Sequence, residues 1–240
     1  MKVVIFNQKG GVGKTTTAVN LGAALARSGA GRVVLADLDP QMHLTASLGF
    51  DPEAAGWTAA DWLAGRPGAP VEVPDEPGLS LVPGAADPLS AEGGLPEVAD
   101  DWLIMDCAPV WSPLVLGFIK ACDLVICPLE PDFLGLSGVN RLLRQLRQEG
   151  LPLDRIRLLV SRYNRRLVVH REVRARLLER FGDGMLLPVE INSSVRLAET
   201  PGYGRTIFTH APDSTGATDF TTLASLLTGR GKKKTRRQDA

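Results

Sequence analysis

Short apolar runs, separated by polar and glycine-rich stretches, recur along the chain and predict β-strands. Four runs have the length and composition of strands: residues 2–7, 32–39, 101–109 and 123–131. Residues 155–164 are predicted to form a strand followed by a loop. A shorter run at residues 79–83 predicts a further strand. Three other stretches carry apolar residues at helical spacing: residues 15–29, 136–150 and 170–182. Residues 223–227 end one more predicted helix.

The order of these elements predicts the fold class. Strands that alternate with helices form a mostly parallel, twisted sheet with helices on both faces, so the chain is predicted to be an α/β protein. Residues 1–228 are assigned to one domain, and the basic residues 229–240 are expected to form a disordered tail. Residues 51–101 are rich in proline, glycine and acids, which makes them too polar for a second core. They are expected to form a lid or an interaction surface.

Candidate binding residues directly follow three of the predicted strands. Ligands in such sheets bind at the carboxyl ends of the strands, and residues 7–17, 37–41 and 106–109 fall at such ends. Residues 6–17 read FNQKGGVGKTTT. This segment matches most of the phosphate-binding pattern G-x-x-x-x-G-K-[ST], but Gln8 replaces the first glycine and an extra lysine, Lys9, follows it.

The glycine-rich segment contains the residue types that bind a nucleoside triphosphate and Mg²⁺. Three glycines within residues 10–13 allow backbone N–H groups to approach phosphates, and the start of the next helix adds partial positive charge. Lys14 is expected to reach the β- and γ-phosphates, Thr15 to bind Mg²⁺, and Thr16 to reach the α-phosphate. The alternative is a glycine-rich turn that binds nothing.

Acidic residues end two neighbouring strands of the predicted sheet. Asp106 ends the run WLIMD, where phosphate-loop enzymes place a ligand of the hydrated Mg²⁺ ion. Asp37 and Asp39 end the run at residues 32–39. One of these two can help to hold the metal shell and the other can orient the attacking water. The alternative for either acid is a capping or turn role.

Charge is unevenly distributed although the formal net charge is zero. Residues 51–101 contain eleven acids and one base, whereas residues 141–180 contain twelve arginines and four acids. Residues 229–240 contain six bases and one acid. This distribution indicates a polyanionic partner, most plausibly nucleic acid; the alternative is a solvated arginine-rich helix followed by a solubilising tail.

The three cysteines, Cys107, Cys122 and Cys127, cannot all form disulfides with one another. No export signal accompanies them, which favours a reducing cytoplasm. Cys122 and Cys127 flank an apolar run with no histidine nearby, so they are interpreted as buried thiols and not as metal ligands.

Several motifs together resemble the deviant Walker-A ATPases of the ParA/MinD class. The resemblance rests on KGGVGKTT, on DLDPQ and on the strand that ends at Asp106. The segment CPLEPDFLGLSGVNRLL, residues 127–143, is similar to ParA and Soj proteins, and residues 191–227 look like their C-terminal block. Outside residues 51–101 the resemblance covers roughly four-fifths of the chain. The set of motifs is specific for the superfamily and less so for the ParA branch.

The resemblance implies a Mg²⁺-dependent ATPase that forms a homodimer around two ATP molecules. Lys9 would cross the dimer interface to the ATP of the partner, and its positive charge would offset the negative triphosphate. The catalytic residues would be Lys9, Lys14 and Asp39, and the metal-binding residues Thr15, Asp39 and Asp106. The nucleotide-binding residues implied by the family are Lys9, Gly10, Gly11, Val12, Gly13, Lys14, Thr15, Thr16, Asn164 and Asn192.

Asp39 is assigned by the same resemblance to the water-positioning role in switch I. Residues 106–109 would form switch II, although the family often has two prolines where this chain reads DCAPVWSP. Asn164 and Asn192 would lie beside adenine. INSS replaces the IPRN that is common at that place in relatives, so these contacts are carried over less directly.

ParA-type dimers bind DNA non-specifically in the ATP state, and a ParB-like or cargo-adaptor protein stimulates hydrolysis. The resemblance therefore implies a cytoplasmic, nucleoid-associated protein that drives plasmid or chromosome partition or positions another cargo. Arg165, Arg166, Arg196 and Arg205 are candidate DNA-binding residues. The basic tail has no apolar face, so stable membrane insertion is not expected.

Other functions of the same fold remain open. One alternative is a MinD/ParA-like regulatory ATPase that acts on a protein or cell-envelope complex without binding DNA. A reductase or metal-delivery relative would need paired cysteines at a dimer interface, and Cys107 alone gives weak support for it. A kinase is disfavoured because the sequence shows no site for an acceptor substrate.

Overall fold

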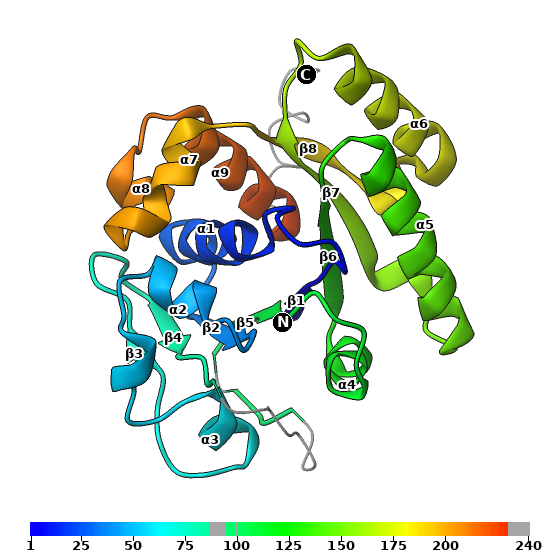
Figure 1. Cartoon of the computed structure of the whole chain (residues 1–240). Coiled ribbons are helices and arrows are strands. Elements are labelled where there is room, and N and C mark those ends of the chain that lie inside the picture. The colour runs from blue at the N-terminus through cyan, green and yellow to red at the C-terminus, as the bar shows by residue number, and fades with distance from the viewer. Residues whose placement is uncertain (87–94, 99, 230–240) are drawn as a thin grey trace, which may run out of the picture.

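The computed structural model describes residues 1–86, 95–98 and 100–229. A mostly parallel sheet lies at the centre of this part (Figure 1). Within this part the sheet has eight strands in the order β3-β4-β2-β5-β1-β6-β7-β8. The strands are β1 (Lys2–Ile5), β2 (Val33–Leu38), β3 (Val71–Glu72), β4 (Leu79–Val82), β5 (Trp102–Cys107), β6 (Leu124–Leu129), β7 (Ile156–Tyr163) and β8 (Leu186–Asn192). Only the β3–β4 pair among these is antiparallel.

Helices cover both faces of the sheet, as predicted for this fold class. They are α1 (Lys14–Arg27), α2 (His43–Ser47), α3 (Ala59–Leu63), α4 (Pro113–Ala121), α5 (Phe133–Gln148), α6 (Val168–Met185), α7 (Val195–Glu199), α8 (Ile207–His210) and α9 (Thr215–Leu227). One core cluster joins α1 and α9 to the sheet, and the other joins α4, α5 and α6 to it (Figure 1). Short 3₁₀ helices occupy Pro52–Ala54, Leu153–Arg155 and Thr200–Tyr203.

The described part of residues 51–101 packs against the main sheet. Trp62 and Leu63 of α3 are buried in the cluster that contains α4 to α6, and Val73 is buried in the cluster that contains α1. Residues 87–94 and 99 lie outside the described residues, as do residues 230–240, which make up almost all of the predicted tail.

The strand register places the candidate residues at one edge. Ile5 of β1 and Asp37 of β2 are both aligned with Asp106 of β5. The loops that follow these strands therefore meet at the carboxyl end of the sheet, as expected from the sequence. All three cysteines are buried and free of disulfides, in agreement with their interpretation as buried thiols. None of the helices within the described residues is long and apolar enough to cross a bilayer.

Candidate nucleotide-binding site

The glycine-rich loop joins β1 to α1 and keeps its backbone open to ligands. Gly11 and Gly13 have φ angles of 74° and 89°, which favour glycine because a side chain is strained there. A Cβ atom added at Gly10 or Gly11 would have no heavy atom within 4 Å, so the space above the loop is empty. The loop leads directly into the amino end of α1, where N–H groups lack helical partners. This is the geometry of a phosphate-binding loop.

Lys14 is the buried cation of this loop. Only 8% of the residue is exposed, and its Nζ atom donates to the carbonyl oxygen of Lys9 at 3.3 Å. Burial lowers the pKa of Lys14, although the nearby Asp106 and Asp39 act in the opposite direction. An anionic ligand above the loop would restore the favourable environment of this ammonium group.

Asp106 and Thr15 form a pair suited to a divalent cation. The Thr15 hydroxyl donates to Oδ2 of Asp106 at 2.6 Å, whereas the buried Oδ1 atom has no hydrogen-bond partner among the described residues. Burial raises the pKa of Asp106 to about 8, although the Thr15 hydrogen bond opposes the rise. A buried carboxylate with an unused oxygen beside a hydroxyl fits hydrated Mg²⁺, which prefers oxygen ligands.

Asp37 and Asp39 have different surroundings although they are two residues apart. Asp37 is fully buried, and its Oδ2 atom accepts hydrogen bonds from the backbone N–H and the hydroxyl of Thr45 at 2.8 and 2.7 Å. It therefore ties α2 to the end of β2. Asp39 is only partly buried and lines the cavity beside the phosphate loop. Of the two acids, Asp39 is the one placed to contact a ligand.

Two cavities meet at the phosphate loop and share Gly11, Gly13 and Thr16. The first has a volume of about 520 Å³ and brings together Lys14, Thr15 and Asp39. The second has a volume of about 350 Å³ and lies beside the ends of β7 and β8. An elongated ligand with phosphates at the loop can therefore extend in either direction.

The second cavity includes one of the two asparagines predicted to contact adenine. Asn192 lines it, with its side-chain amide donating to Asp219 at 3.0 Å. Asn164 is not among the residues that line this cavity, and its side-chain oxygen accepts from the backbone N–H of Arg166 at 3.0 Å. Its adenine contact stays a prediction.

Ser161 and Arg162 line the second cavity and were not predicted from the sequence. Arg162 has a φ angle of 53°, unusual for a side chain of this size, and its guanidinium donates to the carbonyl oxygen of Gly11 at 3.3 Å. Both residues lie near the end of β7. The rule that ligands bind beyond strand ends could have identified them.

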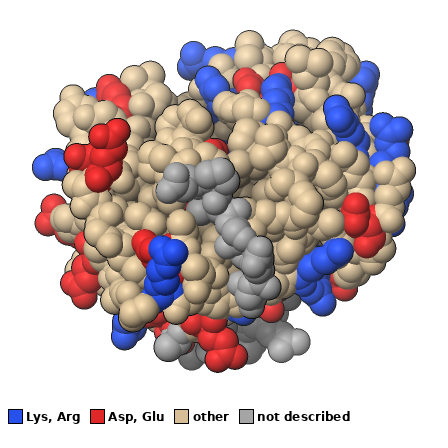
Figure 2. Space-filling model, turned by 60° about the horizontal axis from the view of Figure 1, so that its bottom comes forward, with Lys and Arg blue, Asp and Glu red and all other residues tan. Residues whose placement is uncertain are grey.

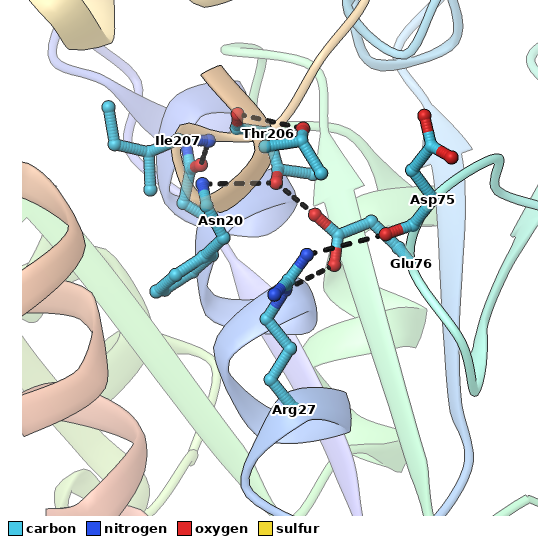
Figure 3. Close-up of polar contacts among 8 residues, drawn as sticks. Asn20, Arg27, Asp75, Glu76, Thr206 and Ile207 are labelled. Carbon is cyan, nitrogen blue, oxygen red and sulfur yellow. Dashed lines mark hydrogen bonds and ion pairs between the residues drawn. The ribbon is translucent and has the colours of Figure 1, made fainter. Parts of the chain in front are cut away.

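Asn20 joins the phosphate-loop helix to α8, far along the chain (Figure 3). Its side chain donates to the carbonyl oxygen of Thr16 at 2.9 Å and accepts from the N–H of Ile207 at 2.7 Å. The neighbouring Thr206 hydroxyl donates to the buried carboxylate of Glu76, which also pairs with Arg27 at 2.6 Å. The start of α8 is therefore held by α1 and by the β3–β4 hairpin.

Lys9 lies in the loop after β1, at the carboxyl end of the sheet, and its side chain is held by an ion pair. Its Nζ atom forms an ion pair with Oδ2 of Asp132 at 2.9 Å, and the two side chains are 31% and 35% exposed. Asp132 precedes α5, so this contact joins residues 123 positions apart. Sequence patterning gave no indication of it.

The arginines predicted to bind DNA come from separate segments. Arg165 and Arg166 are exposed just before α6, and Arg205 is exposed before α8. Arg196 of α7 forms an ion pair with Glu199 at 3.1 Å. Nothing in the described contacts joins the four into one cluster, and their DNA-binding role stays a prediction.

A different set of arginines lines a groove between α5 and α6. The groove has a volume of about 450 Å³ and is lined by Asn140, Leu143, Arg144, Arg147, Arg180 and Phe181. None of its three arginines forms an ion pair with an acid within the described part of the chain. Figure 2 shows that basic side chains are more frequent on the right of the molecule and acidic ones on the left.

Known proteins resemble the chain over nearly its whole length. A family model of the CobQ/CobB/MinD/ParA nucleotide-binding domain matches residues 3–207. The chain is 37% identical to the chromosome-partitioning ATPase Soj of Thermus thermophilus, over 95% of this chain and 96% of Soj. It is 31% identical to the chromosome partitioning protein ParA of Caulobacter vibrioides, over 97% of this chain and 95% of ParA.

A solved structure adds evidence on ligands. Cobyrinic acid a,c-diamide synthase of Mycobacterium smegmatis, with a bound ATP analogue and magnesium, is 32% identical and has a TM-score of 0.73; the match covers 97% of this chain and 95% of the synthase. These two ligands agree with the ATP and Mg²⁺ expected from the sequence. The resemblance to ParA-type proteins and the predicted fold class are confirmed. The chain belongs to the CobQ/CobB/MinD/ParA family of nucleotide-binding domains.

Proposed function

We propose that this protein is a ParA-type ATPase whose ATP-bound dimer binds DNA without sequence specificity. A ParB-like or cargo-adaptor protein would stimulate hydrolysis and release the dimer, and the cycle would partition DNA or position another cargo. The main support is the combination of a phosphate loop, Lys14, Asp39 and Asp106 at one edge of the sheet, in a chain 37% identical to Soj.

Each residue has a role that fits its surroundings. The N–H groups of residues 10–16 and Lys14 would bind the phosphates, and Thr15 and Asp106 would hold Mg²⁺. Bound Mg²⁺ would neutralise phosphate charge. Asp39 lines the same cavity, and among the described residues its carboxylate accepts one hydrogen bond, from the backbone N–H of Gln41 at 3.0 Å. Its other oxygen can therefore orient the attacking water.

Lys9 would act in the dimer by contacting the ATP of the other subunit. Its place in the phosphate-binding loop, with its side chain 31% exposed, supports this role. For DNA, the exposed arginines of α5 and α6 support non-specific phosphate contacts, because guanidinium groups bind phosphate without reading the bases. The predicted partition function rests on this DNA-binding step.

Binding to non-specific duplex DNA with ATP, with ADP and without nucleotide tests the proposal. We expect binding only with ATP, loss of binding in Lys14→Ala, and persistent ATP-state binding in Asp39→Ala because its hydrolysis is blocked. Fluorescence anisotropy at near-physiological salt measures all three. Nucleotide-independent binding would leave only a passive electrostatic contact. Absence of DNA binding, with ATP hydrolysis intact, would favour a regulatory ATPase that acts on a protein complex.

A further inference from the structure

Two glycines that are far apart in the sequence bring their backbones into direct contact. Gly49 follows α2 closely, and Gly204 follows the 3₁₀ helix Thr200–Tyr203. A Cβ atom added at Gly204 would lie 2.7 Å from the Cα atom of Gly49, and one added at Gly49 would lie 3.3 Å from the Cα atom of Gly204. Their φ angles are 81° for Gly49 and 62° for Gly204, which also favour glycine. Because the two segments touch through their backbones, a displacement of one presses directly on the other.

Both segments line the larger cavity at the phosphate loop. α2 contributes His43 and Ser47 to this cavity, and the 3₁₀ helix contributes Thr200 and Pro201. Both segments also lie beside α1, the helix that begins at Lys14 (Figure 1). A ligand in the cavity can therefore contact both segments, and the glycine pair makes each respond to movement of the other.

A continuous run of backbone hydrogen bonds connects Asp39 to Gly49. The N–H of Met42 donates to the carbonyl oxygen of Asp39 at 2.8 Å, and the N–H of Ala46 donates to the carbonyl oxygen of Met42 at 3.1 Å. The N–H of Gly49 then donates to the carbonyl oxygen of Ala46 at 3.0 Å. The acid proposed to orient the attacking water is thus joined through α2 to the glycine contact.

Gly204 is joined in turn to two of the arginines predicted to bind DNA. Arg205 directly follows Gly204 in the chain and is exposed. The carboxylate of Glu199 contacts both Arg196 of α7 and His210 of α8 at 3.1 Å. These contacts join α7, the 3₁₀ helix and α8 into one unit that carries both arginines.

We propose that the contact between Gly49 and Gly204 couples the bound nucleotide to the candidate DNA-binding arginines. Contacts of ATP near Asp39 reach Arg196 and Arg205 through this pair and place both arginines for DNA. This inference rests on the proposed function, in which the ATP state binds DNA. A flexible side chain between the segments would absorb a displacement by changing its rotamer, whereas two packed backbones transmit it. The two glycines are positioning residues because they act through the arginines.

Gly204→Ala tests the inference because the added Cβ atom forces the two backbones apart. Coupling between two sites typically changes an affinity by about 5-fold to 150-fold. With Mg²⁺ and a non-hydrolysable ATP analogue, the Kd of the full chain for duplex DNA should therefore rise at least about fivefold in this variant. Fluorescence anisotropy measures this Kd. The affinity for the analogue without DNA, and dimer formation in analytical ultracentrifugation, should stay as in the wild type; loss of either would make the DNA effect indirect and overturn the inference.

Gly65→Ala is the matched control. Gly65 has a φ angle of 69°, so alanine is strained there to a similar degree, but an added Cβ atom would have no heavy atom within 4 Å. This change should leave the Kd for DNA unaltered. An equal rise of the Kd in Gly65→Ala would reduce the effect to general destabilisation and contradict the coupling.

Gly49→Ala separates coupling from local damage beside Arg205, and it carries the test if Gly204→Ala fails to fold. It alters the same contact from the side of α2, with the milder approach of 3.3 Å. We expect a smaller rise of the Kd for DNA in Gly49→Ala. The double variant should match Gly204→Ala, because both changes remove one shared contact. A wild-type Kd in Gly49→Ala, or additive losses in the double variant, would show that the contact carries no coupling.

Hydrogen exchange tests the coupling without DNA. The backbone N–H of Arg205 donates to the carbonyl oxygen of Thr200 at 3.2 Å, so its exchange rate reports on the order of this segment. The ATP analogue should slow exchange in residues 196–210 of the wild type, and should slow it less in Gly204→Ala. Unchanged exchange in the wild type, or equal slowing in both proteins, would refute the inference. If the wild type binds no DNA in any state, the proposed function is rejected, whereas this measurement still decides whether nucleotide and arginines are coupled.

Discussion

At the scale of single residues, burial distinguishes Asp37 from Asp39, two acids that the hydrophobic pattern alone does not tell apart. Asp37 and Asp39 both follow the same apolar run, yet only Asp39 lines the cavity at the phosphate loop. Burial raises the pKa of Asp37 to about 6, although its hydrogen bonds with Thr45 act in the opposite direction. Asp37 should therefore make the free energy of unfolding depend on pH.

Asp37→Asn should remove a pH dependence of folding. A carboxyl group whose pKa rises from 3.8 to about 6 on folding binds its proton more tightly in the folded protein. Its contribution is most favourable below pH 3.8 and is lost as the pH rises through 6. The wild-type protein should lose about 3 kcal/mol from this group between about pH 4 and pH 6.5.

Urea denaturation of both proteins across that pH range measures the effect. Other acids titrate in both proteins, so the difference between the two unfolding free energies isolates Asp37. The variant should gain stability relative to wild type as the pH rises. A difference that does not change with pH would mean that Asp37 ionises as readily in the folded chain as in the unfolded one.

The sequence predicted the chemistry of residues that lie close together along the chain. The glycines and Lys14 form one continuous motif, so their grouping was visible without a fold. The distinct role of Asp37 depends on Thr45 in a helix that the sequence pattern did not predict. The partner of Lys9 is 123 residues away, and only the folded chain brings the two together.

At the scale of elements, hydrogen bonds hold the short helix α8 in place. Thr206 caps α8 by accepting the N–H of Phe208 at 3.2 Å and donates to the buried Glu76 (Figure 3). Asn20 of α1 accepts the next N–H, that of Ile207. A helix of four residues has too few internal hydrogen bonds to be stable alone. Its position therefore depends on these contacts.

Thr206→Val should destabilise the protein by about 2–4 kcal/mol. Loss of the helix cap costs about 1 kcal/mol, and a buried carboxylate oxygen without its donor costs about 1–3 kcal/mol more. Thr209→Val is the control, because the Thr209 hydroxyl makes only a 3.3 Å bond to a carbonyl of the same turn. It should change stability by less than about 0.5 kcal/mol. Equal losses in urea denaturation would show that Glu76 does not depend on Thr206.

The hydrophobic pattern predicted the strands that are continuous apolar runs and the helices that carry apolar residues at helical spacing over several turns. Strands β1, β2, β4, β5, β6 and β7 and helices α1, α5 and α6 lie within a few residues of their predicted positions. β8 was not predicted, and Pro188 within it is exposed on a strand at the sheet edge, where proline is tolerated. α4 was also not predicted, although Ser112 and Pro113 form a helix-start signal.

At the scale of the whole molecule, an acidic segment and an arginine-rich segment lie at opposite sides of the sheet. The acidic residues 51–101 supply β3, β4 and α3 at one side of the sheet, whereas the arginine-rich residues 141–180 supply much of α5, β7 and α6 at the other (Figure 1). The protein therefore has a basic side although its formal net charge is zero. Such a side can bind phosphates while the acidic side repels them.

Replacing Arg144 and Arg147 with glutamine should weaken ATP-state DNA binding if their groove is part of the proposed DNA surface. Both are exposed, lie on one helix and have no acidic partner among the described residues. Each lost phosphate contact should reduce the slope of log K against log salt by about 0.9, so the double variant should lose about 1.8.

Arg32 and Arg66, each paired with an acid, provide a control of equal charge change. Anisotropy titrations over a range of salt concentrations measure the slopes. An equal reduction of the slope in both double variants would mean that DNA responds to net charge alone. A slope unchanged from wild type in both would place the phosphate contacts elsewhere on the protein.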